Sequence, residues 1–319
     1  MTLTLPVDQP LRFQPYFRAI AWGGRALACF LGKNLPPGTI GESWEVSDHP
    51  HHLSIVATGN LAGHTLRQLM VHHRVELLGP AAAQHERFPW LIKLLDVHDR
   101  LSVQVHPTTE QARTLSSEEG AKSEAWLVLD AQPGSRIYAG LRPGIGPAEL
   151  REALAQGKVA ECLHSFAPKR GDFLYLPAGT VHAAGGGVLL AEIQQTSDAT
   201  FRLYDWDRRD AAGRPRELHV EKGLAAIDWR QGPRDPLAAT VSAALVQSPH
   251  FHIDLVRQEA PLTLGGTGIL QALIVVEGQG RLANGEFAMA GDAWVVPART
   301  AALVLHPEGE LTGLVCSLP

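Results

Sequence analysis

Apolar and polar residues alternate in short runs along most of this chain, a pattern typical of β-strands with one buried face. In the run LSVQVH at residues 101–106, the three apolar side chains fall on one face of the expected strand and the three polar side chains on the other. Turns that contain glycine or proline separate these runs. The same reasoning predicts further strands at residues 125–129, 173–176, 188–194, 270–276 and 293–296.

Helical patterns are few and short. Residues 147–157 begin with proline and end with glycine, the usual order at the two ends of a helix, and Leu150 and Leu154 lie four positions apart. Two more helices are expected at residues 66–78 and 109–120. The 319 residues include 31 glycines and 22 prolines, which favours many tight turns. The sequence therefore predicts a fold dominated by β-structure, with a small insertion at about residues 107–170 that is helical in part.

One β-unit occurs twice. The frame G-D, four mainly apolar residues and proline is found at residues 171–177 and again at 291–297, which predicts two related sandwiches or barrels. Five residues past the proline, the first copy has His182 and the second has Ala302. The segment RQGPRDP has the composition of a linker. We therefore expect an amino-terminal catalytic domain at 1–235 and a carboxy-terminal domain at 236–319 without metal ligands.

Composition and charge exclude several classes of partner. The formal net charge of −5 provides no global positive field for nucleic acid. The three cysteines (Cys29, Cys162 and Cys316) lie far apart, which favours a reducing compartment over a disulfide framework. The chain shows neither a signal peptide nor a long apolar span. We expect a cytoplasmic protein that binds no membrane or nucleic acid and is a monomer or a weak homodimer.

Four potential metal ligands fall in the first copy. Gln104 and His106 share one face of a strand, Glu124 begins the next strand, and His182 follows the turn after the repeated frame. Imidazole, carboxylate and amide oxygen suit Zn²⁺, and also Mn²⁺, Fe²⁺ or Co²⁺, with positions left open for a substrate. This set predicts a catalytic metal site. His98 has no assigned role.

These residues lie in motifs that resemble a known family. The frame G-D-x4-P-x-G-x2-H at residues 171–182 resembles the second motif of the cupin superfamily, and QVH at 104–106 resembles the first, with its glutamate delayed by a long insertion. Over roughly residues 12–230 the chain resembles type I mannose-6-phosphate isomerase in its shorter bacterial form. The matching segments are WGG at 22–24, IGESWEVS at 40–47, LSVQVHP at 101–107, KSEAW at 122–126, GTVHA at 179–183 and AEIQQTSDATFRLYDWD at 191–207.

The resemblance implies two cupin barrels and assigns roles to individual residues. Gln104, His106, Glu124 and His182 would hold one zinc ion per chain, and Lys122 and Arg202 match the active-site lysine and arginine of the family. Ser102 and Lys93 are candidate phosphate contacts, and Trp22 is a further candidate substrate contact. The general base stays open between Lys122 with a lowered pKa, Glu42, and a water molecule on the metal.

The implied activity is the zinc-dependent interconversion of mannose 6-phosphate and fructose 6-phosphate through an enediol. A metal-binding or sugar-sensing cupin without turnover is the alternative from another class, and an isomerase for another sugar phosphate is a third possibility. Arg202 and Lys122 favour an enzyme, because a binding module does not need both cations beside an intact set of metal ligands. A regulatory cupin would usually carry a DNA-binding helical pair, and the sequence shows none.

Overall fold

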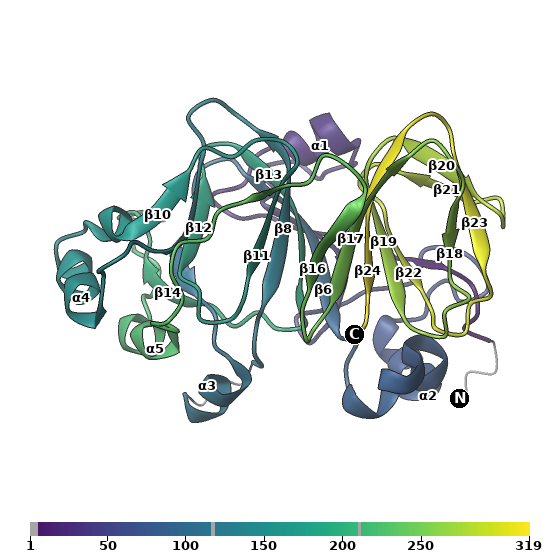
Figure 1. Ribbon diagram of the computed structural model, residues 1–319, viewed down its shortest axis with the longest axis horizontal. Helices are drawn as coiled ribbons and strands as arrows, with labels where there is room; N and C mark the ends of the chain where they lie inside the picture. Colours follow the sequence, from purple (N-terminus) through teal and green to yellow (C-terminus); the bar gives the residue numbers. More distant parts are fainter. Residues whose placement is uncertain (1–5, 116–118, 210–211) are drawn as a thin grey trace.

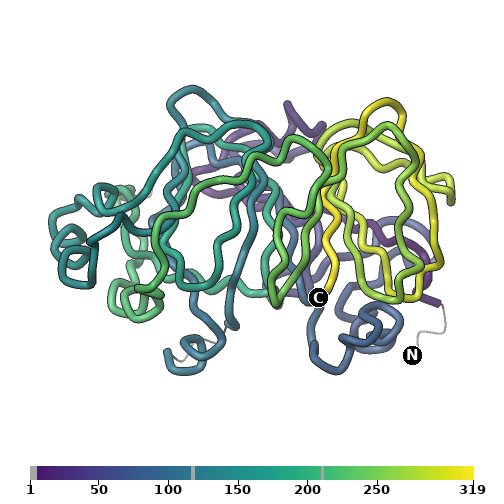
Figure 2. The backbone as a smooth tube through the Cα atoms, in the orientation of Figure 1, coloured from purple at the N-terminus to yellow at the C-terminus, as the bar shows by residue number. Residues whose placement is uncertain are grey.

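The computed structural model describes residues 6–115, 119–209 and 212–319, in which two β-barrels lie side by side (Figure 1). The amino-terminal barrel occupies one half of the molecule and the carboxy-terminal barrel the other, as the backbone trace in Figure 2 shows. Helices are short and lie at the ends of the barrels. The prediction of a β-dominated fold with two cupin units is confirmed.

Two sheets form the amino-terminal barrel. The larger sheet has seven strands, in the order β15 (Leu237–Ala238), β11 (Asp172–Leu176), β8 (Glu124–Ala131), β13 (Val188–Gln195), β6 (Trp90–Val97), β3 (Glu42–Val46) and β2 (Tyr16–Arg18). The smaller sheet has five strands, in the order β10 (Leu163–Phe166), β9 (Arg136–Leu141), β12 (His182–Gly185), β7 (Val103–Val105) and β14 (Phe201–Tyr204). Strands predicted at 125–129, 173–176 and 188–194 are confirmed, whereas the strand predicted at 101–106 is shorter.

The carboxy-terminal barrel also has two sheets. Its larger sheet has six strands, in the order β1 (Leu11–Arg12), β22 (Ala293–Val296), β19 (Gln271–Glu277), β24 (Leu311–Ser317), β17 (His252–Gln258) and β16 (Ala243–Gln247). Its smaller sheet has four, in the order β18 (Leu262–Leu264), β23 (Leu303–Pro307), β20 (Gln279–Leu282) and β21 (Phe287–Met289). A separate hairpin joins β4 (Asp48–His49) to β5 (His52–Leu53).

Each barrel takes one strand from beyond the expected boundary. The early strand β1 pairs with β22 in the carboxy-terminal barrel, and β15 pairs with β11 in the amino-terminal barrel. The largest apolar cluster contains side chains of both barrels, such as Phe173 and Ile274. The two barrels therefore share a core. The domain boundary at residue 235 stays a prediction. A boundary at that position separates β1 and β15 from the strands with which they pair.

The helices agree in part with the sequence prediction. The helix predicted at 66–78 is confirmed with the same bounds, and the one predicted from residue 147 ends two residues early. The helix predicted at 109–120 ends at Thr114, and positions 116–118 of that prediction lie outside the described residues. None of the described helices combines the length and hydropathy needed to cross a bilayer. The helical segments are α1 (Ala26–Leu31), α2 (Leu66–Leu78), η1 (Gly79–Gln84), α3 (Thr109–Thr114), α4 (Pro147–Ala155), η2 (Val159–Cys162) and α5 (Val220–Ala226).

The interiors of the two barrels differ in chemistry. Apolar side chains pack the carboxy-terminal barrel, among them Leu273, Val275 and Trp294, each of which is at most 1% exposed. Ala302, which occupies the position equivalent to His182, is exposed. The amino-terminal barrel instead buries His106, Glu124 and His182. Burial of several polar side chains costs free energy, so this barrel is where a functional site is expected.

Candidate active site

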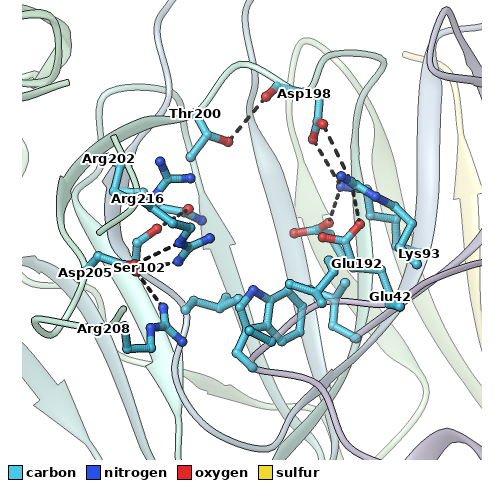
Figure 3. Close-up of a pocket in the computed structure, with 18 of the residues that line it drawn as sticks. Glu42, Lys93, Ser102, Glu192, Asp198, Thr200, Arg202, Asp205, Arg208 and Arg216 are labelled. Carbon is cyan, nitrogen blue, oxygen red and sulfur yellow. Dashed lines mark hydrogen bonds and ion pairs between the residues drawn. The ribbon is translucent and has the colours of Figure 1, made fainter. Parts of the chain in front are cut away.

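A cavity of about 620 Å³ opens into the amino-terminal barrel (Figure 3). This volume is within the usual range for small-molecule sites, roughly 300–1,000 Å³. Residues from six β-strands and from the segments between them form its walls. The cavity is lined by seven of the ten predicted site residues, namely Trp22, Glu42, Lys93, Ser102, Gln104, Lys122 and Arg202.

The other three predicted residues form a buried group beside Gln104. The ligand atoms of His106, Glu124 and His182 all lie within 4.8 Å of one another. The Nε2 atoms of the two histidines are 3.3 and 3.1 Å from the Glu124 carboxylate oxygens. Gln104 lies directly across from His182 in the pairing of β7 with β12, and its amide nitrogen is 3.2 Å from His182 Nε2. Register and strand order thus bring together four residues from three separate segments of the sequence.

The turn before β12 aims His182 at this group. Gly179 has a φ of 88°, in the left-handed region that favours glycine. A Cβ atom at Gly179 would lie 2.9 Å from the backbone nitrogen of Asp228, so any larger residue would clash. The glycine of the frame G-D-x4-P-x-G-x2-H therefore has a steric reason.

Backbone carbonyls orient both imidazoles. His106 Nδ1 is 2.6 Å from the carbonyl oxygen of Ala199, and His182 Nδ1 is 2.9 Å from that of Thr180. A carbonyl oxygen only accepts hydrogen bonds, so each Nδ1 carries a proton and each Nε2 faces the Glu124 carboxylate. Burial, followed by the positive charge of Lys122, lowers the pKa of His106 to about 3, which keeps that ring neutral and leaves a lone pair on its Nε2. Imidazoles held in this orientation are ready to bind a metal through Nε2.

The donor set fits a divalent cation. Both carboxylate oxygens of Glu124 are buried, and the polar atoms nearest to them are Lys122 Nζ and the Nε2 atoms of the two histidines. Burial alone would raise the pKa of Glu124, but the positive charge of Lys122 and interactions with the two histidines lower it well below its usual value. A half-turn of the Gln104 amide would present its oxygen where the nitrogen now lies. Two nitrogens and two oxygens form a mixed donor set that matches borderline metal ions.

Lys122 lies against this group. Its Nζ atom is 2.8 Å from Glu124 Oε2 and 3.2 Å from His106 Nε2. Burial would lower the pKa of Lys122, but the negative charges of Glu124 and Glu192 outweigh burial and raise it. The hypothesis that Lys122 is the general base requires a lowered pKa. The protein groups around Lys122 do not produce that lowering. The two-residue spacing brings Lys122 and Glu124 into contact.

Arginines gather at one end of the cavity. Arg208 and Arg216 donate to Asp205 at 2.6 and 2.8 Å, and Ser102 lies beside them (Figure 3). Arg202 donates from Nη1 to the carbonyl oxygen of Glu217 at 2.7 Å, and its buried Nε has no acceptor among the described residues. Arg208 also pairs with Asp99 at 3.2 Å. Two carboxylates thus lie among the four guanidinium groups that line this end of the cavity, which leaves an excess of positive charge suited to phosphate.

The sequence prediction missed most of this cluster. Arg208, Arg209 and Arg216 also line the cavity, and only Arg202 was predicted. Four arginines within residues 208–216 were the available signal. Such a run usually indicates a solvated surface, so only the fold shows that three of them face a cavity.

Lys93 lies on the opposite wall, among carboxylates. Its Nζ atom is 3.4 Å from Glu192 and 3.9 Å from Asp198 (Figure 3). The same atom lies 5.1 Å from the centre of the Trp44 ring. The structure thus separates Lys93 from Ser102, the other expected phosphate contact. Because its charge is already balanced, Lys93 is less suited to phosphate than the arginines are.

Three acidic side chains define this second wall. Glu42 accepts hydrogen bonds from Trp44 Nε1 at 2.6 Å and from Arg18 at 3.0 Å. Glu192 accepts one from Trp126 Nε1 at 2.9 Å, and burial raises the pKa of Glu192. Glu192 and Asp198 were not predicted, although both lie within the matching segment at 191–207. A motif identifies a segment, but it does not show which of its polar side chains face a cavity.

The fold and the site together define the class of protein: a two-barrel cupin in which one barrel holds a buried His-Glu-His group beside a charged cavity. Comparison with known proteins narrows this class. Residues 11–125 match the model of the type I phosphomannose isomerase catalytic domain. The mannose-6-phosphate isomerase ManA of Bacillus subtilis is 37% identical over 285 residues, which cover 88% of this chain and 89% of that protein.

Two further comparisons agree. The mannose-6-phosphate isomerase of Streptococcus mutans is 36% identical and covers 91% of this chain and 92% of its own. The crystal structure of the Bacillus subtilis mannose 6-phosphate isomerase superposes with a TM-score of 0.86 at 31% identity, covering 97% of this chain and 99% of that one. The chain belongs to the type I phosphomannose isomerase family. The resemblance found in the sequence and the prediction of an isomerase are both confirmed.

Proposed function

We propose that this enzyme interconverts mannose 6-phosphate and fructose 6-phosphate, with one zinc ion held by Gln104, His106, Glu124 and His182. The observation that carries this proposal is a row of side chains across three neighbouring strands. In the strand pairings, Arg202 on β14 lies opposite Gln104 on β7, and Gln104 lies opposite His182 on β12. Opposite residues of paired strands are roughly 5 Å apart, so the arginine end of the cavity lies next to the proposed metal donors, of which Gln104 lines the cavity.

The proposed chemistry divides among the walls of the cavity. A bound divalent metal would act as a Lewis acid toward the sugar oxygens. Arg208, Arg216 and Ser102 would hold the phosphate, and Arg202 would donate to the oxygen that gains charge as the enediol forms. Lys122 and Glu42 are the two chain groups proposed to move the proton between C2 and C1. Lys122 would accept a proton only with the cation bound, because the positive charge of the cation would oppose the carboxylate charges that raise the pKa of Lys122. The cavity walls would orient the sugar and limit the access of water to the reacting carbons.

A substrate panel tests the assignment. The zinc-loaded protein should show its highest kcat/KM on mannose 6-phosphate, compared with glucose 6-phosphate and ribose 5-phosphate. Unphosphorylated mannose should be at least about 100-fold poorer, because the arginines would then have no anionic partner. A preference for another aldose phosphate would support the third possibility. Metal binding without turnover on any sugar would support the non-catalytic alternative.

Solvent exchange tests the enediol. A proton carried by a side chain exchanges with water, so fructose 6-phosphate formed in deuterated water should contain some deuterium at C1. Partial incorporation fits the proposal, because a shielded base returns part of the original proton. The label is measured by proton NMR of the product and of recovered substrate. Complete retention of the original hydrogen under every condition would indicate a hydride shift and remove the proton-transfer role of Lys122 or Glu42.

A further inference from the structure

The loop after β14 has an unusual backbone. Trp206 and Asp207 have φ values of 57° and 55°, and they are the only non-glycine residues of the described chain with positive φ. The left-handed region is strained for a large side chain such as tryptophan. Two consecutive strained residues persist only where the surrounding structure compensates for them.

The side chain of Trp206 provides that compensation. Its indole Nε1 donates to the carbonyl oxygen of Leu101 at 2.6 Å. The guanidinium of Arg100 lies 4.8 Å from the centre of the indole ring, and the rings of Tyr138 and Tyr204 lie 5.6 and 5.5 Å away. Glycine would relieve the backbone strain, but it would lose all of these contacts. The indole thus ties this loop to the segment that leads into β7.

The loop after β14 and the segment that leads into β7 form opposite sides of the arginine end of the cavity. The two left-handed residues turn the chain back, so that Asp205 meets Arg208 three residues later and also accepts from Arg216. On the other side, Leu101 is followed directly by Ser102, which lies beside this cluster in Figure 3. Trp206 itself does not line the cavity. It therefore contacts the supports of the arginine end and does not contact the ligand.

We propose that Trp206 is a positioning residue: its indole N–H and the left-handed turn hold Arg208 and Arg216 against Ser102, in the arrangement that receives a phosphate group. The inference rests on the proposed function, because it takes phosphate as the ligand of this cluster. The indole contacts concern the arginine end of the cavity and not the metal donors. Loss of these contacts should therefore weaken substrate binding and leave the chemical step and the metal content largely unchanged.

The test compares three variants of the zinc-loaded protein. Trp206→Phe keeps an aromatic ring and removes the N–H donor, and it should raise KM for mannose 6-phosphate about tenfold with kcat within about threefold. The dissociation constant of inorganic phosphate, measured by calorimetry, should rise by a similar factor. Tyr204→Phe removes the hydroxyl that donates to Asp207 at 2.8 Å and should raise both values about twofold to threefold. It serves as the second test if Trp206→Phe folds poorly.

The matched control is Trp229→Phe. Trp229 packs against the same apolar cluster as Trp206 but does not line the cavity, so KM and phosphate affinity should stay unchanged. Unaltered KM and phosphate affinity in both Trp206→Phe and Tyr204→Phe would overturn the inference. So would a fall in kcat and metal content at constant KM, which indicates a general structural role. A wild type that binds phosphate without isomerising mannose 6-phosphate would refute the proposed function alone, since phosphate affinity would still test the role of Trp206.

Discussion

Replacing both His106 and His182 with alanine will remove the bound metal and lower turnover by at least about 1,000-fold. These residues supply both nitrogen donors of the candidate site, and Glu124 and Gln104 alone would be a weak ligand pair. A catalytic metal contributes several kcal/mol to transition-state stabilisation, which corresponds to a rate factor of this size. Metal content is measured by elemental analysis of the purified protein, and turnover is measured on mannose 6-phosphate. Wild-type protein should contain one equivalent of metal per chain.

The matched control for this experiment is a double variant at exposed histidines. His98→Ala with His306→Ala removes two imidazoles that lie at the surface, away from the buried group. This protein should retain one equivalent of metal and wild-type turnover. Circular dichroism establishes that both double variants are folded. Full metal retention without His106 and His182, or two equivalents in the wild type, would contradict the assignment.

Arg202→Ala should lower kcat by about 100-fold to 1,000-fold, the usual cost of losing one donor to a developing negative charge. Arg202 is half-buried on the wall of the cavity, and its buried Nε is a donor without an acceptor among the described residues. Metal content and thermal stability should remain close to wild type, because Arg202 is not one of the proposed ligands. Steady-state kinetics on mannose 6-phosphate, combined with metal analysis and a thermal melt, measures all three.

A second variant at Arg202 separates the effect of its charge from the effect of its planar shape, and a variant at another arginine is the control. Arg202→Lys keeps the positive charge but loses the planar, multiple-donor group, so its kcat should lie between those of Arg202→Ala and the wild type. Arg170→Ala removes a solvent-exposed arginine paired with Glu277 and should leave kcat unchanged. Near-normal turnover in Arg202→Ala would show that the arginine is structural.

Much of the candidate site was predictable, because short sequence patterns set which of its residues share a strand face and where its turns lie. The alternation at residues 101–106 correctly places the metal-ligand candidates Gln104 and His106 on the polar side, and the glycine at 179 sets the turn before His182. Glu124 is different, since 17 residues separate it from His106 in the chain. No periodicity spans that distance, and the family resemblance was needed to connect the two.

Other features arise only from contacts between distant segments. Arg208 and Arg216 are polar residues in an arginine-rich stretch, and their positions along the chain do not show that they face a cavity. The strand β1 pairs with β22, far away in sequence, so the early residues join the second barrel. Trp206 has its left-handed conformation because Leu101, more than 100 residues earlier, accepts its N–H.

The sequence by itself determined several central strands of both barrels, three of the helices, the duplicated unit and the chemical types of the proposed metal ligands. These properties depend on hydrophobic periodicity, on turn residues and on side-chain chemistry, all of which act within a few positions. The tertiary structure alone decided which charged residues share a cavity and which end of that cavity holds the arginines. It also decided that β1 and β15 pair with strands on the other side of the expected domain boundary. Those outcomes depend on strand register and on loops closed by long-range hydrogen bonds, where the burial of one side chain is decided by partners far away in the chain.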